Sequence, residues 1–440
     1  MSQRFYVVSE KGDGYAIAWR LCQEGYEVVV RCKDQFFRQN LDGIVEKTTS
    51  RPRTSDIVIF DSVGSGTLAD RRRSEGYGVV GGSELADWLE VDRTLAAQTW
   101  RELEIATPES KKFESIADGI NFVSSHGGRW VFEPVGSVDC AFSYCGRDEM
   151  DMVSMLLHFQ STIGDSTPFL LQAFVEGVCV STEGWFDGED WIEGAWSSTI
   201  EAKGLCVGDL GPKTECSWCV VWPYSEAPRI AREVHQKLTP LLSEANYIGP
   251  WGMSCVVNSE GIYVLETTPR FGYDAIQAYS SLMQLKLGEM LEKLVDGNTQ
   301  LWPIAQDEIA AALRVVVAPY PFGGAEHPAS GDLPVRYRHE DENYLWLTGV
   351  RQQKRQLLSA PTDGVVGVVT ASGDKERSYE VFTALKDRAR RLMIPNLYWR
   401  DDVGTGVGAA WGQLAELGYE TPLSHSPSEE PTSLLPAVAG

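Results

Sequence analysis

The chain has 440 residues, which is enough for about two to four domains. Hydrophobic residues make up 43% and charged residues 23%, as in ordinary soluble globular proteins. The formal net charge of −23 argues against nonspecific binding to the phosphate backbone of nucleic acids. No apolar run reaches the roughly 18 residues that a membrane-spanning helix requires, so we expect no contact with a membrane.

The start of the chain and its cysteines favour a cytoplasmic location. The sequence begins "MSQRFYVVSEKGDGY", without a basic region followed by an apolar stretch, so we expect no signal peptide. The nine cysteines are scattered and odd in number, which favours free thiols in a reducing compartment. Cys216 and Cys219 have the C-x-x-C spacing, but no second pair follows. We therefore interpret them as small residues beside a strand rather than as zinc ligands or a redox pair.

The amino-terminal region predicts a parallel α/β domain. "RFYVVSEKGDGYAIAWRLCQEGYEVVVRC" has the pattern of a strand, a glycine turn, a helix and a strand. "DIVIFDS" and "GYGVVGG" continue the alternation, which is typical of a parallel sheet. A helix and a proline-marked connection follow in "VDRTLAAQTWRELEIATPESKKF".

The middle of the chain predicts short strands and three helices. "RWVFEPV", "CAFSYC" and "PFLLQAFV" have strand character. Helices are expected over about 148–160, over 227–245, and over 282–297, where the last ends at a glycine. The apolar stripes on the first two indicate core positions: Met152, Met155, Leu156 and Phe159, and Ile230, Val234, Leu238 and Leu241.

The carboxy-terminal region predicts a further strand-led unit. "IAAALRVVVAPYPF" and "DGVVGVVTASGD" have strand character, and "SYEVFTALKDRARRLMI" predicts a long helix. The last stretch, "TPLSHSPSEEPTSLLPAVAG", is rich in serine and proline and has no periodicity, so we expect disorder there.

One strand end has the residues of a ligand site. The apolar run from Ile262 to Leu265 is followed by Glu266, then by Arg270 and Gly272. A carboxylate, a guanidinium and a glycine at one strand end are suited to holding a cation and a phosphate. The alternative is a structural ion pair between Glu266 and Arg270.

Five segments in order resemble the phosphoribosylamine–glycine ligase family of the ATP-grasp superfamily, from about residue 3 to 405. These are "GDGYAIAWRL", "GVVGGSELADWLEVDRTLAAQTWRELEIATPE", "GDLGPKTEC", "GPWGMSCVVNSEGIYVLETTPRFGYDAIQAY" and "DGVVGVVTASGDKERSYEVFTALKDRARRLMIPNLYWRDDVG". The resemblance implies an α/β fold with a Rossmann-like pre-ATP-grasp domain (1–100), an ATP-grasp domain of two subdomains (101–305, with a lid at about 125–175), a β-rich α+β domain (306–405) and a tail (406–440).

The resemblance also implies ATP and Mg²⁺ as cofactors, a small-molecule amine and carboxylate as substrates, and a monomer or homodimer. Glu266 matches a metal-binding position, and Thr268 stands where the family has an asparagine, with a hydroxyl that can ligate magnesium. Arg270 and Lys203 match catalytic positions. The expected cofactor-binding residues are Gln172, Lys213, Thr214, Gly211, Gly12 and Gly14.

Several positions depart from the family. Glu133 stands where the family has a lysine that reaches ATP phosphates, and Ala173 stands where a hinge acid holds ribose. The glycine-lysine hairpin is shortened in "GSVDCAFSYC". We therefore expect weak ATP binding that Glu133→Lys strengthens more than Glu133→Gln does.

Two functions are compatible with these departures. The first is an ATP-dependent carboxylate–amine ligase that acts through an acyl phosphate on altered substrates. The alternative is a degenerate ATP-grasp protein without ligase activity that serves as a binding or scaffold module. An active enzyme has to replace the positive charge missing at Glu133, for which Lys203 and Lys213 are the candidates.

Overall fold

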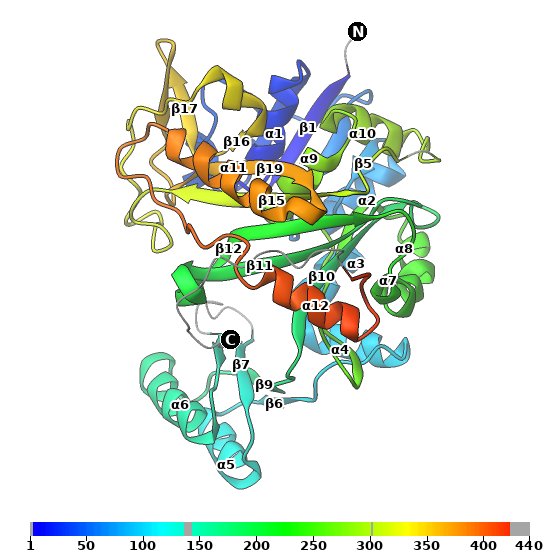
Figure 1. Ribbon diagram of the computed structural model, residues 1–440, viewed down its shortest axis with the longest axis vertical. Coiled ribbons are helices and arrows are strands. Elements are labelled where there is room, and N and C mark those ends of the chain that lie inside the picture. The colour runs from blue at the N-terminus through cyan, green and yellow to red at the C-terminus, as the bar shows by residue number, and fades with distance from the viewer. Residues whose placement is uncertain (1–2, 136–142, 301, 423–440) are drawn as a thin grey trace.

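A computed structural model describes residues 3–135, 143–300 and 302–422. Figure 1 shows a parallel α/β unit and the carboxy-terminal unit at one end, a large antiparallel sheet in the middle, and a small subdomain at the other end. The predicted disordered stretch lies almost entirely outside the described residues, as do residues 136–142 of the shortened hairpin. Within the described part, no helix is both long and apolar enough to cross a membrane.

The amino-terminal unit is a five-stranded parallel sheet in the order β3-β2-β1-β4-β5. Its strands are buried on both faces, as their continuous apolar runs predict: Phe5 and Val7 enter one core while Tyr6 and Val8 enter the other. Its elements are β1 (Arg4–Ser9), α1 (Tyr15–Gln23), β2 (Glu27–Cys32), the 3₁₀ helix η1 (Phe36–Gln39), β3 (Glu46–Lys47), β4 (Ile57–Phe60), α2 (Gly66–Ser74), β5 (Gly78–Val80), α3 (Glu84–Val91) and α4 (Arg93–Glu102).

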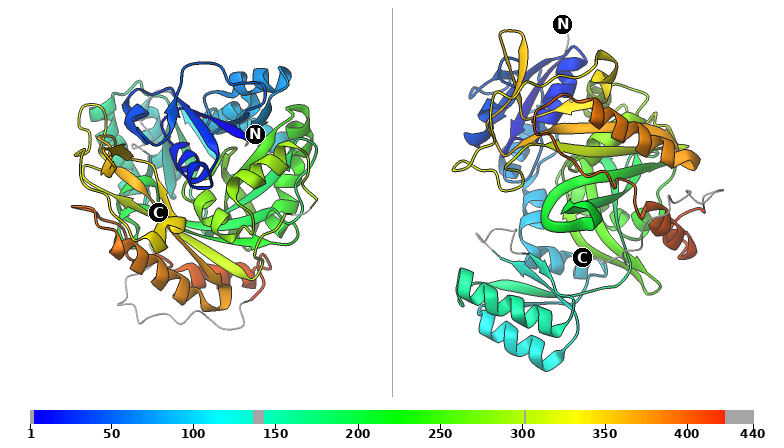
Figure 2. Two further views of the ribbon diagram at one scale, coloured as in Figure 1. Left: turned by 90° about the horizontal axis from the view of Figure 1, so that it is seen from above. Right: turned by 60° about the vertical axis from the view of Figure 1, so that its left-hand side comes forward.

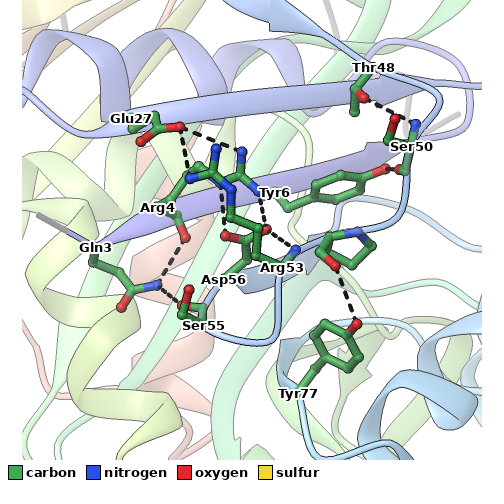
Figure 3. Close-up of polar contacts among 11 residues, drawn as sticks. Gln3, Arg4, Tyr6, Glu27, Thr48, Ser50, Arg53, Ser55, Asp56 and Tyr77 are labelled. Carbon is green, nitrogen blue, oxygen red and sulfur yellow. Dashed lines mark hydrogen bonds and ion pairs between the residues drawn. The ribbon is translucent and has the colours of Figure 1, made fainter. Parts of the chain in front are cut away.

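A polar cluster fixes the amino-terminal end of this sheet, opposite the glycine turn that follows β1 (Figure 3). Arg4 Nη2 lies 2.6 Å from Asp56 Oδ2, and Arg4 Nη1 lies 3.5 Å from Glu27 Oε1. Arg53 Nη1 lies 3.4 Å from the same Glu27 oxygen. These ion pairs join the start of β1 to the start of β2 and to the residue that precedes β4.

The small subdomain, called the lid below, is a four-stranded antiparallel sheet in the order β6-β9-β7-β8, covered on one face by two helices. It projects from the rest of the molecule (Figure 2) and has a hydrophobic core of its own. The predicted core residues Met152, Leu156 and Phe159 are buried in it, and Met155 packs against it. Its elements are β6 (Ser110–Phe113), α5 (Ile116–His126), β7 (Trp130–Pro134), β8 (Tyr144–Cys145), α6 (Glu149–Ile163) and β9 (Phe169–Ala173).

The central sheet has eight antiparallel strands in the order β14-β13-β10-β11-β12-β15-β19-β16. Strand β12 pairs with β15, so this sheet continues across residue 305 into the carboxy-terminal unit. The predicted domain boundaries stay a prediction. The strands are β10 (Val178–Asp187), β11 (Trp196–Cys206), β12 (Leu210–Tyr224), β13 (Ile248–Asn258), β14 (Gly261–Thr268), β15 (Glu308–Val316), β16 (Leu345–Leu347) and β19 (Val365–Asp374).

Helices and a separate hairpin complete this part of the fold. Helix α11 and strand β19 form where the sequence predicts them, and Gly297 with a φ of 68° follows α10 as predicted. The elements are η3 (Val207–Asp209), α7 (Arg229–Glu233), η4 (His235–Leu238), α8 (Thr239–Glu244), α9 (Ala275–Leu282), α10 (Leu287–Val295), η5 (His339–Tyr344), β17 (Val350–Gln353), β18 (Gln356–Ser359), η6 (Lys375–Arg377), α11 (Ser378–Arg391) and α12 (Val407–Glu416).

The helix predicted over 227–245 is broken in the structure. Val234 has φ −120° and ψ −65°, outside helical values, and the segment continues as a 3₁₀ turn before α8. Pro240 lies in the first turn of α8 and has no N–H to donate to Gln236, so a continuous helix would lose that bond. The four predicted stripe residues still pack in the core, because Ile230, Val234 and Leu238 are buried and Leu241 packs against them.

Candidate active site

A cluster of charged side chains lies between the central sheet and the lid. Lys203 Nζ, on β11, is 3.2 Å from Glu201 Oε1 and 3.5 Å from Glu266 Oε1 on β14. The two carboxylates, Glu201 first, raise the pKa of Lys203, and Lys203 lowers the pKa of Glu266. The side chains of Lys203 and Glu266 are 40% and 43% exposed, so a ligand can reach both.

Arg93 completes this cluster, although the sequence analysis did not single it out. It is the first residue of α4, directly after the N-cap Asp92. Arg93 Nη2 lies 3.4 Å from Glu133 Oε2 on the lid strand β7 and 3.9 Å from Glu266 Oε2. Arg93 therefore brings a positive charge beside Glu133, the position at which the resemblance implies a lysine. Its position could have been noticed in the sequence, because Arg93 belongs to the segment "VDRTLAAQTW" at the start of the region that resembles the family's grasp domain.

Arg270 lies close to this cluster but is held by a different acid. Its Nε is 2.9 Å from Glu90 Oε1 and its Nη2 is 2.8 Å from the same oxygen. Its guanidinium also stacks over the ring of Tyr273, 4.3 Å from the centroid. Glu90 is near the end of α3, so Arg270 ties the turn after β14 to the amino-terminal unit. Glu266 and Arg270 therefore pair with other residues and do not form the structural ion pair that was the alternative interpretation of the sequence.

Lys213 and Thr214 lie near the start of β12, in the hairpin that β11 and β12 form. Lys213 Nζ is 2.9 Å from Asp209 Oδ2. Burial raises the pKa of the Cys145 thiol on the lid and of the Cys179 thiol on β10, and nearby positive charges, Lys213 among them, oppose part of that rise. The Thr214 hydroxyl donates to the Lys203 carbonyl at 2.7 Å. Gly211 has a φ of 81°, in the left-handed region that favours glycine.

Arg400 holds this hairpin from the carboxy-terminal unit and was not predicted as a site residue. It is 4% exposed, and its Nη1 donates to the Gly204 carbonyl at 2.7 Å and to Asp209 Oδ1 at 2.9 Å. Its Nη2 donates to Asp402, which in turn accepts from the Gly208 amide at 2.9 Å. The turn that precedes Lys213 is therefore fixed by a segment almost two hundred residues away in the chain.

Gln172 lies on β9, which pairs with the β7 strand that carries Glu133, and Thr268 lies on β14 with Glu266. Gln172 is half-buried on β9, where it pairs with Val131 of β7, and its neighbour Ala173 pairs with Trp130. Thr268 is half-buried on β14, two residues after Glu266 and so on the same face of that strand. Within the described residues, no three His, Cys, Asp or Glu side chains gather in a way that could hold a metal ion. Cys216 and Cys219 are free thiols buried on β12.

Glu266, Thr268 and Glu201 nevertheless suit magnesium in the nature of their donor atoms. Magnesium prefers oxygen ligands and commonly takes one or two carboxylates, with substrate phosphates supplying further oxygens. The ammonium of Lys203 now lies between the two carboxylates. The residues thus fit a metal that arrives together with phosphate, but they do not form a complete metal site without it.

Gly12 and Gly14 lie away from this cluster, in the turn after β1, and Gly12 lines a cavity beside the amino-terminal sheet. Gly12 has a φ of 98°, and its N–H donates to Ser9 Oγ at 2.9 Å. The Gly14 N–H donates to the carboxylate of Asp61. The N–H groups of these two predicted cofactor-binding glycines are thus already engaged inside the protein. The cavity is joined to the charged cluster through Tyr273, which contacts both Arg270 and Asp13.

Comparisons with known proteins agree with this architecture. No family model matches the chain. It is 23% identical over 353 residues to the phosphoribosylamine–glycine ligase of Corynebacterium ammoniagenes, covering 77% of this chain and 79% of that protein. The crystal structure of phosphoribosylamine–glycine ligase from Thermotoga maritima matches with a TM-score of 0.68 and 16% identity, over 91% of this chain and 99% of that one.

A biotin carboxylase from Campylobacter jejuni, solved as a complex with β,γ-ATP, matches with a TM-score of 0.57 and 10% identity, over 96% of this chain and 98% of that one. These likenesses show that the chain has the ATP-grasp fold, as the sequence predicts. The predicted resemblance to the phosphoribosylamine–glycine ligase family is confirmed at the level of sequence and of fold.

Proposed function

We propose that the protein is an ATP-dependent carboxylate–amine ligase whose substrates differ from those of phosphoribosylamine–glycine ligase. In this class of reaction a carboxylate takes the terminal phosphoryl group of ATP and becomes an acyl phosphate. The amine attacks the acyl carbon, the bond to phosphate breaks, and the amine nitrogen loses a proton. A small-molecule amine and a small-molecule carboxylate in the cytoplasm are therefore the expected partners.

One observation carries the proposal: Arg93, Lys203 and Glu266 meet between the sheet and the lid from three elements remote in sequence. Phosphoryl transfer depends on positioning and on cations that stabilise the transferring group. Arg93 and Lys203 supply such cations in spite of Glu133. Both are now paired with carboxylates, so binding of a polyphosphate would exchange these internal ion pairs for contacts with the ligand.

The other residues have roles that follow from their chemistry. Arg270 would orient a substrate anion or the acyl phosphate, and Gln172 would bond an adenine edge with its amide. Lys213 and Thr214, held on the fixed hairpin, would cover the phosphates. Glu266 and Thr268 would hold magnesium, which neutralises charge on the transferring phosphoryl group when it is bound.

Calorimetry with and without magnesium tests the assignment of Glu266. In the unmodified protein, we expect magnesium to strengthen ATP binding. Glu266→Gln should abolish this strengthening and leave binding of free ATP no weaker, because Lys203 and Arg93 lose a competing carboxylate. Glu244→Gln, an exposed acid at the end of α8, is the matched control and should behave as the unmodified protein.

Release of ADP across a panel of amines and carboxylates then tests for activity. Release that requires one amine and one carboxylate together, and that Glu266→Gln loses, is the expected result. Failure of the unmodified protein to bind ATP with magnesium would instead favour the degenerate, non-catalytic ATP-grasp protein. The ion pairs that now occupy Lys203 and Arg270 are the observation in favour of that second function.

A further inference from the structure

The cavity beside the amino-terminal sheet lies where a ligand is expected in a parallel α/β fold. In the order β3-β2-β1-β4-β5, the chain turns in opposite directions from β1 and β4, and ligands bind at the carboxyl ends of strands at such a switch point. Asp13 follows β1 and Asp61 follows β4, and both line the cavity. The turn after β14, helix α9 and the carboxy-terminal unit close its other sides.

The charges around this cavity are mainly negative. Its walls carry two cations and five carboxyl groups: Lys11, Arg314, Asp13, Asp61, Glu215, Asp274 and Asp363. Arg314 is already neutralised, because it pairs with both oxygens of Asp274 at 3.0 Å and with Glu215 at 2.9 Å. Lys11 is an exposed side chain at the rim.

Three of the polar side chains in the wall have unused capacity for hydrogen bonds. Asp13 accepts a single long bond of 3.3 Å from the Tyr273 hydroxyl, and Asp363 accepts one from the Val365 amide at 3.1 Å. Gln277 is 6% exposed, and its Oε1 has no hydrogen-bond partner among the described residues. The unpartnered Gln277 oxygen and the two half-buried carboxyl groups with spare capacity favour a ligand that donates hydrogen bonds.

The same walls are unsuited to phosphate. The amides of Gly12 and Gly14 donate to Ser9 and Asp61, so these two N–H groups are not available to hold an anion there. The second cation, Arg314, is taken by two carboxylates. A phosphoryl group placed beside Asp13 and Asp363 would meet two carboxyl groups, while the other cation of the walls, Lys11, is an exposed side chain at the rim.

We propose that this cavity binds the ammonium group of a small, phosphate-free amine, with Asp13 and Asp363 as its counter-ions and Gln277 as a further acceptor. The inference rests on the proposed ligase function, of which this amine would be the nucleophilic substrate. It separates this chain from phosphoribosylamine–glycine ligase, whose name states a phosphorylated amine.

Size and protonation agree with an amine of this kind. The cavity has a volume of about 120 Å³, close to a cavity of about 150 Å³ that is known to hold benzene, so it has room for roughly six non-hydrogen atoms. Burial raises the pKa of Asp13 to about 8 and that of Asp363 to about 6, so an ammonium ion bound beside them relieves the desolvation of two carboxylates.

Calorimetry on the nucleotide-free protein at pH 8.5 tests the inference separately from ATP binding. The probes are n-butylammonium, 1,4-diaminobutane and ribose 5-phosphate. We expect the two amines to bind and ribose 5-phosphate not to bind. Asp13→Asn and Asp363→Asn should each weaken amine binding by about tenfold or more, since each removes a charge-assisted hydrogen bond. Asp118→Asn, an exposed acid on α5 of the lid, is the matched control.

Binding of ribose 5-phosphate as tight as that of the amines, absence of amine binding, or amine binding unchanged in both variants would each overturn the inference. The comparison of probes needs no variant, so it holds even if one substitution prevents folding. Failure of the ligase function appears instead as loss of ATP binding with magnesium. The two failures are therefore distinguishable.

Discussion

At the scale of single residues, Glu133 decides how freely Arg93 can serve a ligand. The carboxylate accepts a hydrogen bond from Ser143 at 2.7 Å and lies 3.4 Å from Arg93. Glu133→Gln removes the charge but keeps the acceptor, so Arg93 is released for phosphate. We expect about tenfold tighter binding of ATP with magnesium, the value of one modest charge-assisted hydrogen bond.

Calorimetric titration of the variants checks this prediction. The sequence alone favours Glu133→Lys as the larger gain, but the structure already has a cation at this point. We therefore expect Glu133→Gln to give most of the gain of Glu133→Lys. Glu114→Gln, on an exposed lid acid paired with Lys112, is the control. Equal affinities in the unmodified protein and Glu133→Gln would show that Arg93 does not contact the nucleotide.

Asp13 gives a second prediction at this scale, concerning pH and stability. Burial, together with Glu215 and Asp61, raises its pKa to about 8, while Arg270 and Arg314 oppose the rise; Tyr273 contacts it. The native state thus binds a proton that the unfolded state has lost between about pH 4 and pH 8. In this window Asp13 ionises in the unfolded state only, which lowers the free energy of unfolding by up to about 1.4 kcal/mol for each unit of rising pH.

Asp13→Asn removes this pH-dependent contribution. The free energy of unfolding of the variant, relative to that of the unmodified protein, should therefore increase from pH 5 to pH 8 and then level off. Urea unfolding at several pH values measures the difference. Other acids with raised pKa values, such as Glu183, titrate in both proteins and cancel. A difference that does not change with pH would mean that Asp13 is exposed to solvent when ionised.

At the scale of elements, the hairpin between β11 and β12 depends on the carboxy-terminal unit. Arg400 bonds the Gly204 carbonyl and Asp209, and Asp402 bonds the Gly208 amide, so the turn is held at both sides. Arg400→Ala should raise amide hydrogen exchange across residues 203–214 by about tenfold, since it breaks several of these bonds. Hydrogen exchange read by mass spectrometry measures it.

The matched control is Arg391→Ala, which removes another arginine of the carboxy-terminal unit, one that pairs with Asp341 away from the hairpin. It should leave exchange in residues 203–214 unchanged. If both variants behave alike, the hairpin is held by its own strand pairing and not by Arg400.

At the scale of the whole molecule, the separate hydrophobic core of the lid implies unequal stability. One large core joins the amino-terminal sheet, the central sheet and the carboxy-terminal unit, whereas the lid has a small core of its own. Phe132 is fully buried in the lid core, with ring centroids 4.7 Å from Phe159 and 4.8 Å from Phe169. Phe132→Ala should destabilise the lid alone, by about 3–5 kcal/mol.

Hydrogen exchange again separates the regions. We expect faster exchange in residues 110–173 and no change in the central sheet, because opening of the lid need not open the larger core. Phe186→Ala, at a fully buried position of β10 in the large core, should speed exchange in the central sheet and leave residues 110–173 unchanged. Loosening of the entire chain by Phe132→Ala would show that the lid and the body unfold as one cooperative unit.

Much of the fold could be predicted because local patterns specify it. The continuous apolar runs of β1 and β4 imply a sheet buried on both faces, and the stripe on α6 implies a helix with one buried face. The break at Val234 was missed, because the apolar spacing continues through it and only Pro240 interrupts the helix. Helix α12 was missed because it lies in a region interpreted as a tail.

The candidate site also has a part that the sequence predicts and a part that only the tertiary structure shows. The sequence by itself determined that Glu266 and Arg270 lie at one strand end, because strand geometry and spacing are local properties. Only the tertiary structure decided their partners: Lys203 and Arg93 meet Glu266, while Arg270 turns to Glu90. Asp13, Glu215 and Asp363 come from three distant segments, so the acidic cavity exists only when the chain is folded. Spacing along a chain fixes which side chains share an element, but the packing of elements fixes which charges face each other, and the chemistry of a site depends on the latter.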